Sequence, residues 1–291
     1  MALRMRGGGQ SATMTTARWR EETQVDLGLE GRTVLVAGAS KGIGHGITAA
    51  FLAEGARVMM TGRGAADLAL AHAGFEAEYG DRVALFSGDM TETVEIRAAL
   101  DAAIARFGPL HTLVANVGGG YLKPGWDVED DDLDAALQHN LTGTMRLVRE
   151  GVRRMKGGDQ GREAARSAAD ASIIVISSIA GVDAMGAPVA YGVAKAGLNH
   201  YVASMARLLG PALRINVVAP GNILFDGGSW DLNMRARPEA WTRWVEREVA
   251  LQRFGRVEEI ADVVAFLASR RAGFVTGATW IADGGQVRST S

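Results

Sequence analysis

The chain has 291 residues, and its 31 Lys and Arg against 33 Asp and Glu leave a formal net charge of −2. This balance gives no reason to expect a nucleic acid or an anionic membrane as a partner. No apolar run approaches the roughly 18 residues needed to span a bilayer. The absence of cysteine excludes disulfides, thiolate nucleophiles and cysteine-ligated zinc. Since nothing argues for export, we expect a cytoplasmic protein that acts on small molecules.

Residues 1–24 differ in composition from the rest of the chain. They hold four arginines and a Gly7-Gly8-Gly9 run, with no acidic residue before Glu21. They contain no hydrophobic core of the kind that a secretory signal has, although an Arg-rich, acid-poor start is also compatible with a transit peptide. We expect a flexible N-terminal tail over 1–24, followed by a single domain over 25–291.

Apolar strands alternate with helical patterns from residue 32 onward. The predicted strands lie near 33–37, 57–61, 82–87, 110–115, 172–177, 213–218 and 278–282. This alternation is typical of a parallel sheet with helices on both faces. The predicted fold class is therefore α/β, a Rossmann-type doubly wound parallel sheet of about seven strands. Such folds bind nucleotides at the carboxyl ends of the strands, where the strand order reverses.

The first strand leads into a glycine-rich turn and then a helix. Glycines stand at 38, 42 and 44, and an apolar helical pattern follows. Glycine permits a tight turn and lets backbone N–H groups approach a pyrophosphate, and the helix N-terminus favours the anion. The predicted nucleotide contacts here are Gly38, Ser40, Lys41, Gly42, Ile43 and Gly44. A turn that binds nothing is the alternative, which the flanking strand and helix disfavour.

The end of the second strand bears on the choice of nucleotide. An NAD site usually carries an acidic residue there, which accepts hydrogen bonds from the 2′-hydroxyl. Thr61 stands about where that acid would lie, and neither neighbour is acidic. Arg63, with Ser40 and Lys41, could surround a 2′-phosphate. We therefore expect NADP(H) in preference to NAD, with Arg63 as a solvated surface residue as the competing interpretation.

Tyr191 and Lys195 lie four apart, so on a helix their side chains share one face. A cation roughly 5 Å from a phenol favours phenolate by about 3 kcal/mol at an effective dielectric near 20, which is about two pKa units. We therefore predict that Lys195 lowers the pKa of Tyr191 and makes it a general acid or base. Ser178 could hold a carbonyl or alcohol oxygen beside Tyr191. A structural hydroxyl at Ser178 is the alternative.

These segments resemble the short-chain dehydrogenase/reductase family in its single-domain, 3-oxoacyl reductase-like branch, over nearly all of 30–285. The glycine motif, with Ala37 in place of the usual Thr, and the Ser178-to-Tyr191 spacing of thirteen both match the family. The resemblance implies further nucleotide contacts after the third, fourth and sixth strands, at Asp89, Met90, Asn116, Gly118, Pro220, Gly221 and Ile223. It also implies that Asn140 completes a catalytic tetrad with Ser178, Tyr191 and Lys195.

The same resemblance implies an oxidoreductase that moves a hydride between a nicotinamide nucleotide and an alcohol or ketone. Lys195 would also bind the nicotinamide ribose, and Asn140 would hold a water that relays protons through Lys195. Family members often self-associate, so a dimer or tetramer is expected. Alternatives are an NAD-dependent alcohol dehydrogenase, a reductase of carrier-bound 3-oxoacyl groups, and a nucleotide-sensing regulator without turnover.

One position departs from the family pattern. Phe225 replaces a Thr that, by resemblance, contacts the nicotinamide carboxamide. Gly227 and Gly228 follow, and then a helical stretch with Trp230, Trp241 and Trp244 in the region that covers the substrate pocket. The glycines suit a hinge and the tryptophans suggest an apolar or ring-bearing substrate. Tryptophans that only pack this region onto the domain or a partner subunit are the alternative.

Overall fold

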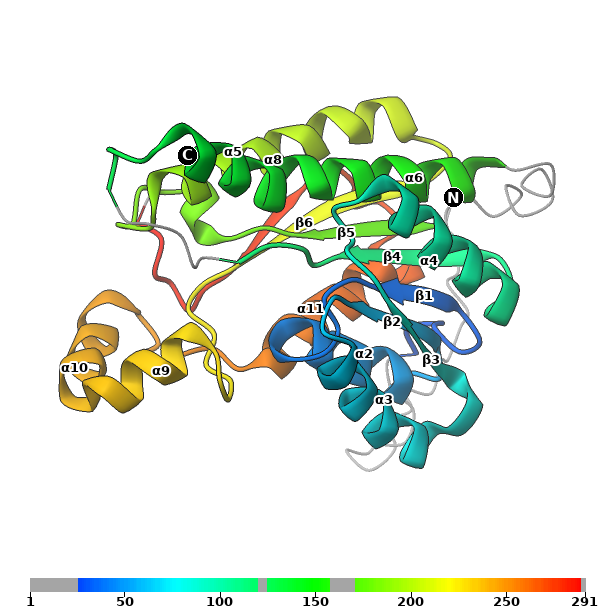
Figure 1. Cartoon of the computed structure of the whole chain (residues 1–291), viewed down its shortest axis with the longest axis horizontal. Helices are drawn as coiled ribbons and strands as arrows, with labels where there is room; N and C mark the ends of the chain where they lie inside the picture. The colour runs from blue at the N-terminus through cyan, green and yellow to red at the C-terminus, as the bar shows by residue number, and fades with distance from the viewer. Residues whose placement is uncertain (1–25, 120–124, 158–170, 289–291) are drawn as a thin grey trace, which may run out of the picture.

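The computed structural model describes residues 26–119, 125–157 and 171–288. Within these ranges one parallel sheet lies between two layers of helices (Figure 1). The tail predicted over 1–24 lies outside the described residues, so that prediction stays open.

The sheet has seven strands in the order β3-β2-β1-β4-β5-β6-β7, and every adjacent pair is parallel. The strands are β1 Thr33–Val36, β2 Arg57–Gly62, β3 Val83–Ser87, β4 Leu110–Ala115, β5 Ser172–Ile176, β6 Arg214–Pro220 and β7 Thr279–Ala282. The doubly wound Rossmann-type prediction is confirmed. The strand order reverses between β1 and β4, which places the expected nucleotide site at the carboxyl ends of those strands.

Helices cover both faces of the sheet, as Figure 1 shows. One face carries α2 Gly42–Ala53, α3 Ala65–Tyr79 and α11 Val257–Ala268, and the other carries α4 Thr93–Phe107, α6 Gly143–Gly157 and α8 Val189–Leu209. The remaining elements are η1 Gly80–Arg82, α5 Asp130–Leu137, η2 Gln138–Thr142, η4 Ile179–Gly181, α9 Ser229–Ala236, α10 Pro238–Glu248 and η5 Arg270–Ala272. The α9–α10 pair projects from the body of the fold.

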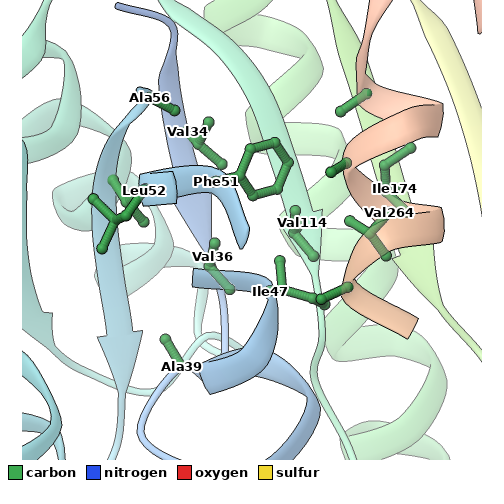
Figure 2. Close-up of a cluster of buried hydrophobic side chains, with 14 of the residues drawn as sticks. Val34, Val36, Ala39, Ile47, Phe51, Leu52, Ala56, Val114, Ile174 and Val264 are labelled. Atoms are coloured by element: carbon green, nitrogen blue, oxygen red, sulfur yellow. The ribbon is translucent and has the colours of Figure 1, made fainter. Parts of the chain in front are cut away.

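Branched and aromatic side chains fill the layer between the sheet and the helices α2 and α11. Figure 2 shows Ile47 and Phe51 of α2 close to Val34, Val36 and Val114 of the sheet, and all five are fully buried. Burying one such side chain contributes about 1.5–3 kcal/mol relative to leaving it exposed. This packing fixes the first turn of α2 against the end of β1, which is where the glycine-rich turn lies.

Candidate active site

A cleft of about 560 Å³ runs along the carboxyl ends of the strands. Most of the residues predicted to bind a nucleotide line it, namely Gly38, Ser40, Lys41, Ile43, Arg63, Asp89, Met90, Asn116, Gly118, Tyr191, Gly221 and Ile223. The lining does not include Gly42, Gly44, Pro220 or Lys195. The predicted residues therefore converge on one site, although they come from six separate segments of the chain.

The glycine-rich turn is held tightly to the end of β4. Gly38 has φ +64° and Gly42 has φ +58°, the left-handed region that favours glycine. A Cβ on Gly38 would lie 2.5 Å from the backbone oxygen of Asn116, and one on Gly44 would overlap the oxygen of Gly38. The Asn116 Nδ2 donates to the oxygens of Ala37 and Gly38, at 3.2 Å each. Only glycine fits at positions 38 and 44, and without side chains there the backbone of the turn can approach a ligand closely.

The end of β2 corrects one residue of the sequence analysis. Thr61 is fully buried and its Oγ1 donates to the Val36 oxygen at 3.4 Å, so its side chain faces the core and not the cleft. Gly62 lines the cleft in its place, because successive residues of a strand point to opposite faces. A Cβ on Gly62 would meet nothing closer than Leu68 at 3.6 Å and the Ser40 Oγ at 3.8 Å. The position that would carry the acid of an NAD site is therefore Gly62. It has no side chain, although the space beside it could hold one.

Charged side chains gather at the same end of the cleft. Arg63 is 64% exposed, and its Nη1 lies 4.0 Å from the Asp89 Oδ2. The other oxygen of Asp89 accepts hydrogen bonds from the backbone N and the Oγ1 of Thr91, both at 2.8 Å. An exposed ion pair of this length contributes little to stability. The Arg63 guanidinium therefore lies near the cleft, and a more highly charged anion can take the place of Asp89 as its partner.

Ser178, Tyr191 and Lys195 meet beside the cleft, at the end of β5 and the start of α8. Ser178 caps η4, where its Oγ accepts from the backbone N of Ala180 at 3.1 Å, and its hydroxyl is near enough to the Tyr191 phenol to lower the pKa of that group. Lys195 is 3% exposed, and its Nζ donates to the Ile176 oxygen at 3.1 Å. The same Nζ lies 5.7 Å from the centre of the Tyr191 ring. The three side chains therefore form one contiguous group.

The protonation of this group differs from the sequence-based expectation. Burial raises the pKa of Tyr191, while the hydrogen bond from Ser178 acts in the opposite direction. Burial also lowers the pKa of Lys195 to about 8. The predicted net lowering at Tyr191 was wrong because it counted the neighbouring charge and neglected the removal of the phenol itself from water. Near neutral pH, Tyr191 is thus a protonated phenol.

Asn140 lies in η2, a single π-helical turn between α5 and α6. Such turns are frequent at functional sites. Asn140 is fully buried, with its Nδ2 donating to Ala136 at 3.1 Å and its Oδ1 accepting from the backbone N of Gly119 at 2.9 Å. A Cβ on Gly118 would overlap that Oδ1 and would lie 3.4 Å from the Lys195 Nζ. Asn140, Gly118 and Lys195 are therefore close neighbours.

His139 lines the cleft and was missed by the sequence analysis. Burial lowers the pKa of its imidazole, and the nearby Arg63 lowers it further, while Asp89 acts the other way. The only sequence signal was its position next to Asn140. The π-helical turn that aims it at the cleft was not predicted from the sequence.

Phe225 fills a specific place in the cleft. A Cβ on Gly42 would lie 2.7 Å from the Phe225 ring, and one on Gly228 would lie 2.8 Å from it. The ring is therefore sandwiched between the glycine-rich turn and the residue that precedes α9. The departure from the family pattern thus adds an aromatic contact to the turn.

The described part of the chain offers neither a membrane span nor a metal centre. None of its helices combines the length and the hydrophobicity that a transmembrane segment needs. Among the same residues, no three His, Asp or Glu side chains cluster in a way that could hold a metal ion.

Comparison with known proteins gives the family of the chain. A family model described as enoyl-(acyl carrier protein) reductase matches residues 38–286. The 3-oxoacyl-[acyl-carrier-protein] reductase of Escherichia coli (strain K12) is 32% identical over 260 residues, covering 89% of this chain and 98% of that protein. The chain belongs to the short-chain dehydrogenase/reductase family. This family member is accordingly an oxidoreductase that acts on alcohol or ketone groups.

Solved structures of the family share the fold over nearly their whole length. A short-chain dehydrogenase/reductase from Brucella melitensis, described as a glucose/ribitol dehydrogenase, is 27% identical with a TM-score of 0.76, covering 89% of this chain and 98% of that one. An NADPH-bound short chain oxidoreductase from Pseudomonas aeruginosa PAO1 is 25% identical with a TM-score of 0.80, covering 90% and 99%. The second has an atypical catalytic centre by its description.

Proposed function

We propose that the protein transfers a hydride between NADP(H) and an alcohol or ketone, with Tyr191 as the general acid in the reducing direction. The observation that supports this most strongly is the group of Ser178, Tyr191 and Lys195 at the edge of a cleft that begins at a glycine-rich turn. A phenol that is protonated at neutral pH suits donation to a developing alkoxide.

The cleft fits a nicotinamide dinucleotide, which supplies the hydride when bound. The tight turn at Gly38 and Gly44 leaves no room for a Cβ, so backbone N–H groups are accessible to a pyrophosphate. We assign the adenine end to Asp89 and Met90, the middle to Asn116 and Gly118, and the nicotinamide end to Pro220, Gly221, Ile223, Tyr191 and Lys195.

The residues around the substrate oxygen have distinct roles in this proposal. Ser178 donates a hydrogen bond to the oxygen as negative charge develops on it. This hydrogen bond is strongest in the transition state, where the charge on the oxygen is greatest. Tyr191 gives its phenolic proton to the same oxygen. The Lys195 ammonium stabilises the phenolate left behind, and Asn140 keeps the wall beside Lys195 in place through its contact with Gly119. Asn140 would also hold the water that returns a proton from solvent.

The preference for NADP(H) over NAD rests on the end of β2. Gly62 offers no carboxylate to a ribose 2′-hydroxyl, and Ser40, Lys41 and Arg63 supply donors and positive charge beside it. The relative from Pseudomonas aeruginosa binds NADPH by its description. A 2′-phosphate would displace Asp89 as the partner of Arg63.

We also propose that the protein is cytoplasmic and forms a homodimer or tetramer. The edge strand β7 leaves Trp280 36% and Ile281 44% exposed, and unpaired strand edges with apolar side chains favour association. The substrate would be a small carbonyl or alcohol compound. Neither a nucleic acid nor a membrane is proposed as a partner.

The direct test is a panel of ketones offered with NADPH and, separately, with NADH. We expect loss of the reduced-nicotinamide absorbance with at least one ketone, and a lower KM for NADPH. Tight nucleotide binding without turnover on any ketone or alcohol would support the alternative of a nucleotide-sensing regulator. A strong preference for NADH would contradict the assignment of the 2′-phosphate site.

A further inference from the structure

The charged side chains of the cleft are confined to one half of it. Lys41, Arg63, Asp67 and Asp89 all follow β1, β2 or β3. The other half is lined by Tyr191 of α8 and by the segment after β6, namely Gly221, Ile223, Phe225, Gly227, Gly228, Ser229 and Trp230. None of these described residues is charged. A substrate that approaches Tyr191 from this side therefore meets neutral and aromatic groups.

Trp230 is the member of an aromatic cluster that reaches the cleft. It stacks on Trp244 with ring centres 5.6 Å apart at 18°, meets Trp241 edge-on at 5.2 Å, and lies 5.5 Å from Phe254. Trp241, Trp244 and Phe254 do not line the cleft in the described part of the chain, whereas Trp230 does. Three neighbours thus hold the Trp230 indole in a fixed orientation, which lowers the entropy lost when a ligand stacks on it.

The alternative interpretation, that the tryptophans only pack this region onto the domain, applies to only part of the cluster. Trp241 and Trp244 of α10 pack on each other edge-on, at 5.6 Å and 71°, and their contacts with Trp230 of α9 join the two helices. Phe225 extends the aromatic wall toward the glycine-rich turn, since its ring is fixed between Gly42 and Gly228. Phe225 and Trp230 therefore form an aromatic wall of the cleft that Tyr191 also lines.

We propose that the substrate of this site is an uncharged alcohol or ketone with a flat ring that stacks on Trp230. This inference rests on the proposed function, because it concerns the same cleft and places the reacting oxygen at Tyr191. A stacked ring pair is worth more than its buried area alone, whereas a linear acyl chain gains only burial from the same wall. A phosphate or carboxylate next to the carbonyl would lack a cationic partner among the described residues of this half.

The experiment measures binding, so that it does not depend on turnover. The protein saturated with NADPH cannot react with an alcohol, and calorimetry then gives a Kd for each of three ligands. The ligands are a phenyl-substituted secondary alcohol, its cyclohexyl counterpart and a linear secondary alcohol of the same carbon count. We expect the phenyl compound to bind tightest. Trp230→Leu should weaken it by about 3- to 10-fold and should change the linear alcohol by less than about twofold.

Two further variants separate stacking from damage to the fold. Trp230→Phe keeps a flat ring and should retain most of the preference for the phenyl compound. Trp244→Leu removes a ring that lies outside the cleft but orients Trp230, and should reduce the preference for the phenyl compound by less than Trp230→Leu does. The inference would be overturned if Trp230→Leu lost the same fold of affinity for all three ligands. It would also be overturned if wild type bound the linear alcohol more tightly than the phenyl compound. Tightest binding of the linear compound would favour an acyl-chain substrate.

This inference and the proposed function fail in distinguishable ways. If no ketone is reduced but the phenyl alcohol still binds tightest in a Trp230-dependent way, the hydride-transfer proposal is wrong and the ligand class stands. If ketones are reduced with no dependence on a ring or on Trp230, the chemistry stands and the aromatic wall is only structural.

Discussion

The two sides of the cleft are held by different forces. The sheet side rests on the buried strands β1, β5 and β6 and on backbone contacts so close that a Cβ cannot enter, as at Gly44. The α9 side is held by the aromatic cluster and by exposed ion pairs, in which Arg235 contacts Asp226 and Asp231. Exposed pairs of this kind contribute little. The sheet side is therefore the more rigid of the two and carries Ser178 and Lys195. Phe225 and Trp230, which are proposed to select the substrate, lie on the α9 side, which is held more weakly to the body of the fold.

The largest expected difference between the two sides is catalytic. Ser178→Ala on the sheet side should lower kcat by about 10²- to 10³-fold, since it removes a donor aimed at the developing charge. Ser229→Ala is a matched control, because Ser229 also lines the cleft but belongs to α9. Steady-state kinetics with NADPH and one ketone compares them. Similar losses in both variants would contradict the division of roles.

The second comparison concerns glycines. Gly44→Ala would overlap the oxygen of Gly38, so we expect a loss of about 1–3 kcal/mol in the free energy of unfolding and at least about tenfold weaker NADPH binding. Gly227→Ala places a Cβ where nothing lies within 4 Å, although its φ of +70° adds backbone strain. Urea titration and calorimetry test both variants. If Gly227→Ala weakens NADPH binding as much as Gly44→Ala, the account of the rigid side is wrong.

The third prediction concerns nucleotide selectivity at the rigid side. Gly62→Asp introduces a carboxylate beside Ser40, where it would repel a 2′-phosphate and accept from a 2′-hydroxyl. We expect the ratio of kcat/KM for NADPH over NADH to fall by at least about tenfold, since like-charge contacts cost several kcal/mol. Gly74→Asp on α3, with open space around it, adds the same charge away from the cleft and should leave the ratio unchanged.

The smallest effect is on the pH dependence of stability. The pKa of Lys195 falls from 10.5 to about 8 on folding. Between these values the unfolded chain holds a proton that the folded one has lost, so this group makes stability rise with pH from about 8 toward 10.5. Urea midpoints across this range should rise less in Lys195→Met than in wild type. An unchanged slope in the variant would mean that the Lys195 ammonium is not destabilised by burial.

The sequence predicted those features that depend on local pattern. Each of the seven strands begins and ends within two residues of its predicted bounds, because alternating apolar and helical patterns report local structure directly. Most of the predicted nucleotide-binding residues line one cleft, at the switch point where such a sheet binds ligands. Their assigned roles in binding and catalysis remain predictions.

What the sequence did not predict depends on packing. Thr61 faces the core and Gly62 faces the cleft because of the pleat of β2, and the sequence left the position of that pleat open by one residue. The raised pKa of Tyr191 follows from its desolvation in the folded protein, which no local sequence pattern reports. The contact of Phe225 with Gly42 joins residues 183 positions apart, and no local pattern reports it.

The central claim is that the half-buried, protonated Tyr191 donates the proton that accompanies hydride transfer. The most direct measurement is a single-turnover reaction of Tyr191→Phe preloaded with NADPH and mixed with a ketone that wild type reduces. We predict unchanged NADPH affinity and a rate of NADPH oxidation lower by at least about 10²-fold, the lower end of the range for general acid catalysis. A rate within a few fold of wild type would contradict the claim.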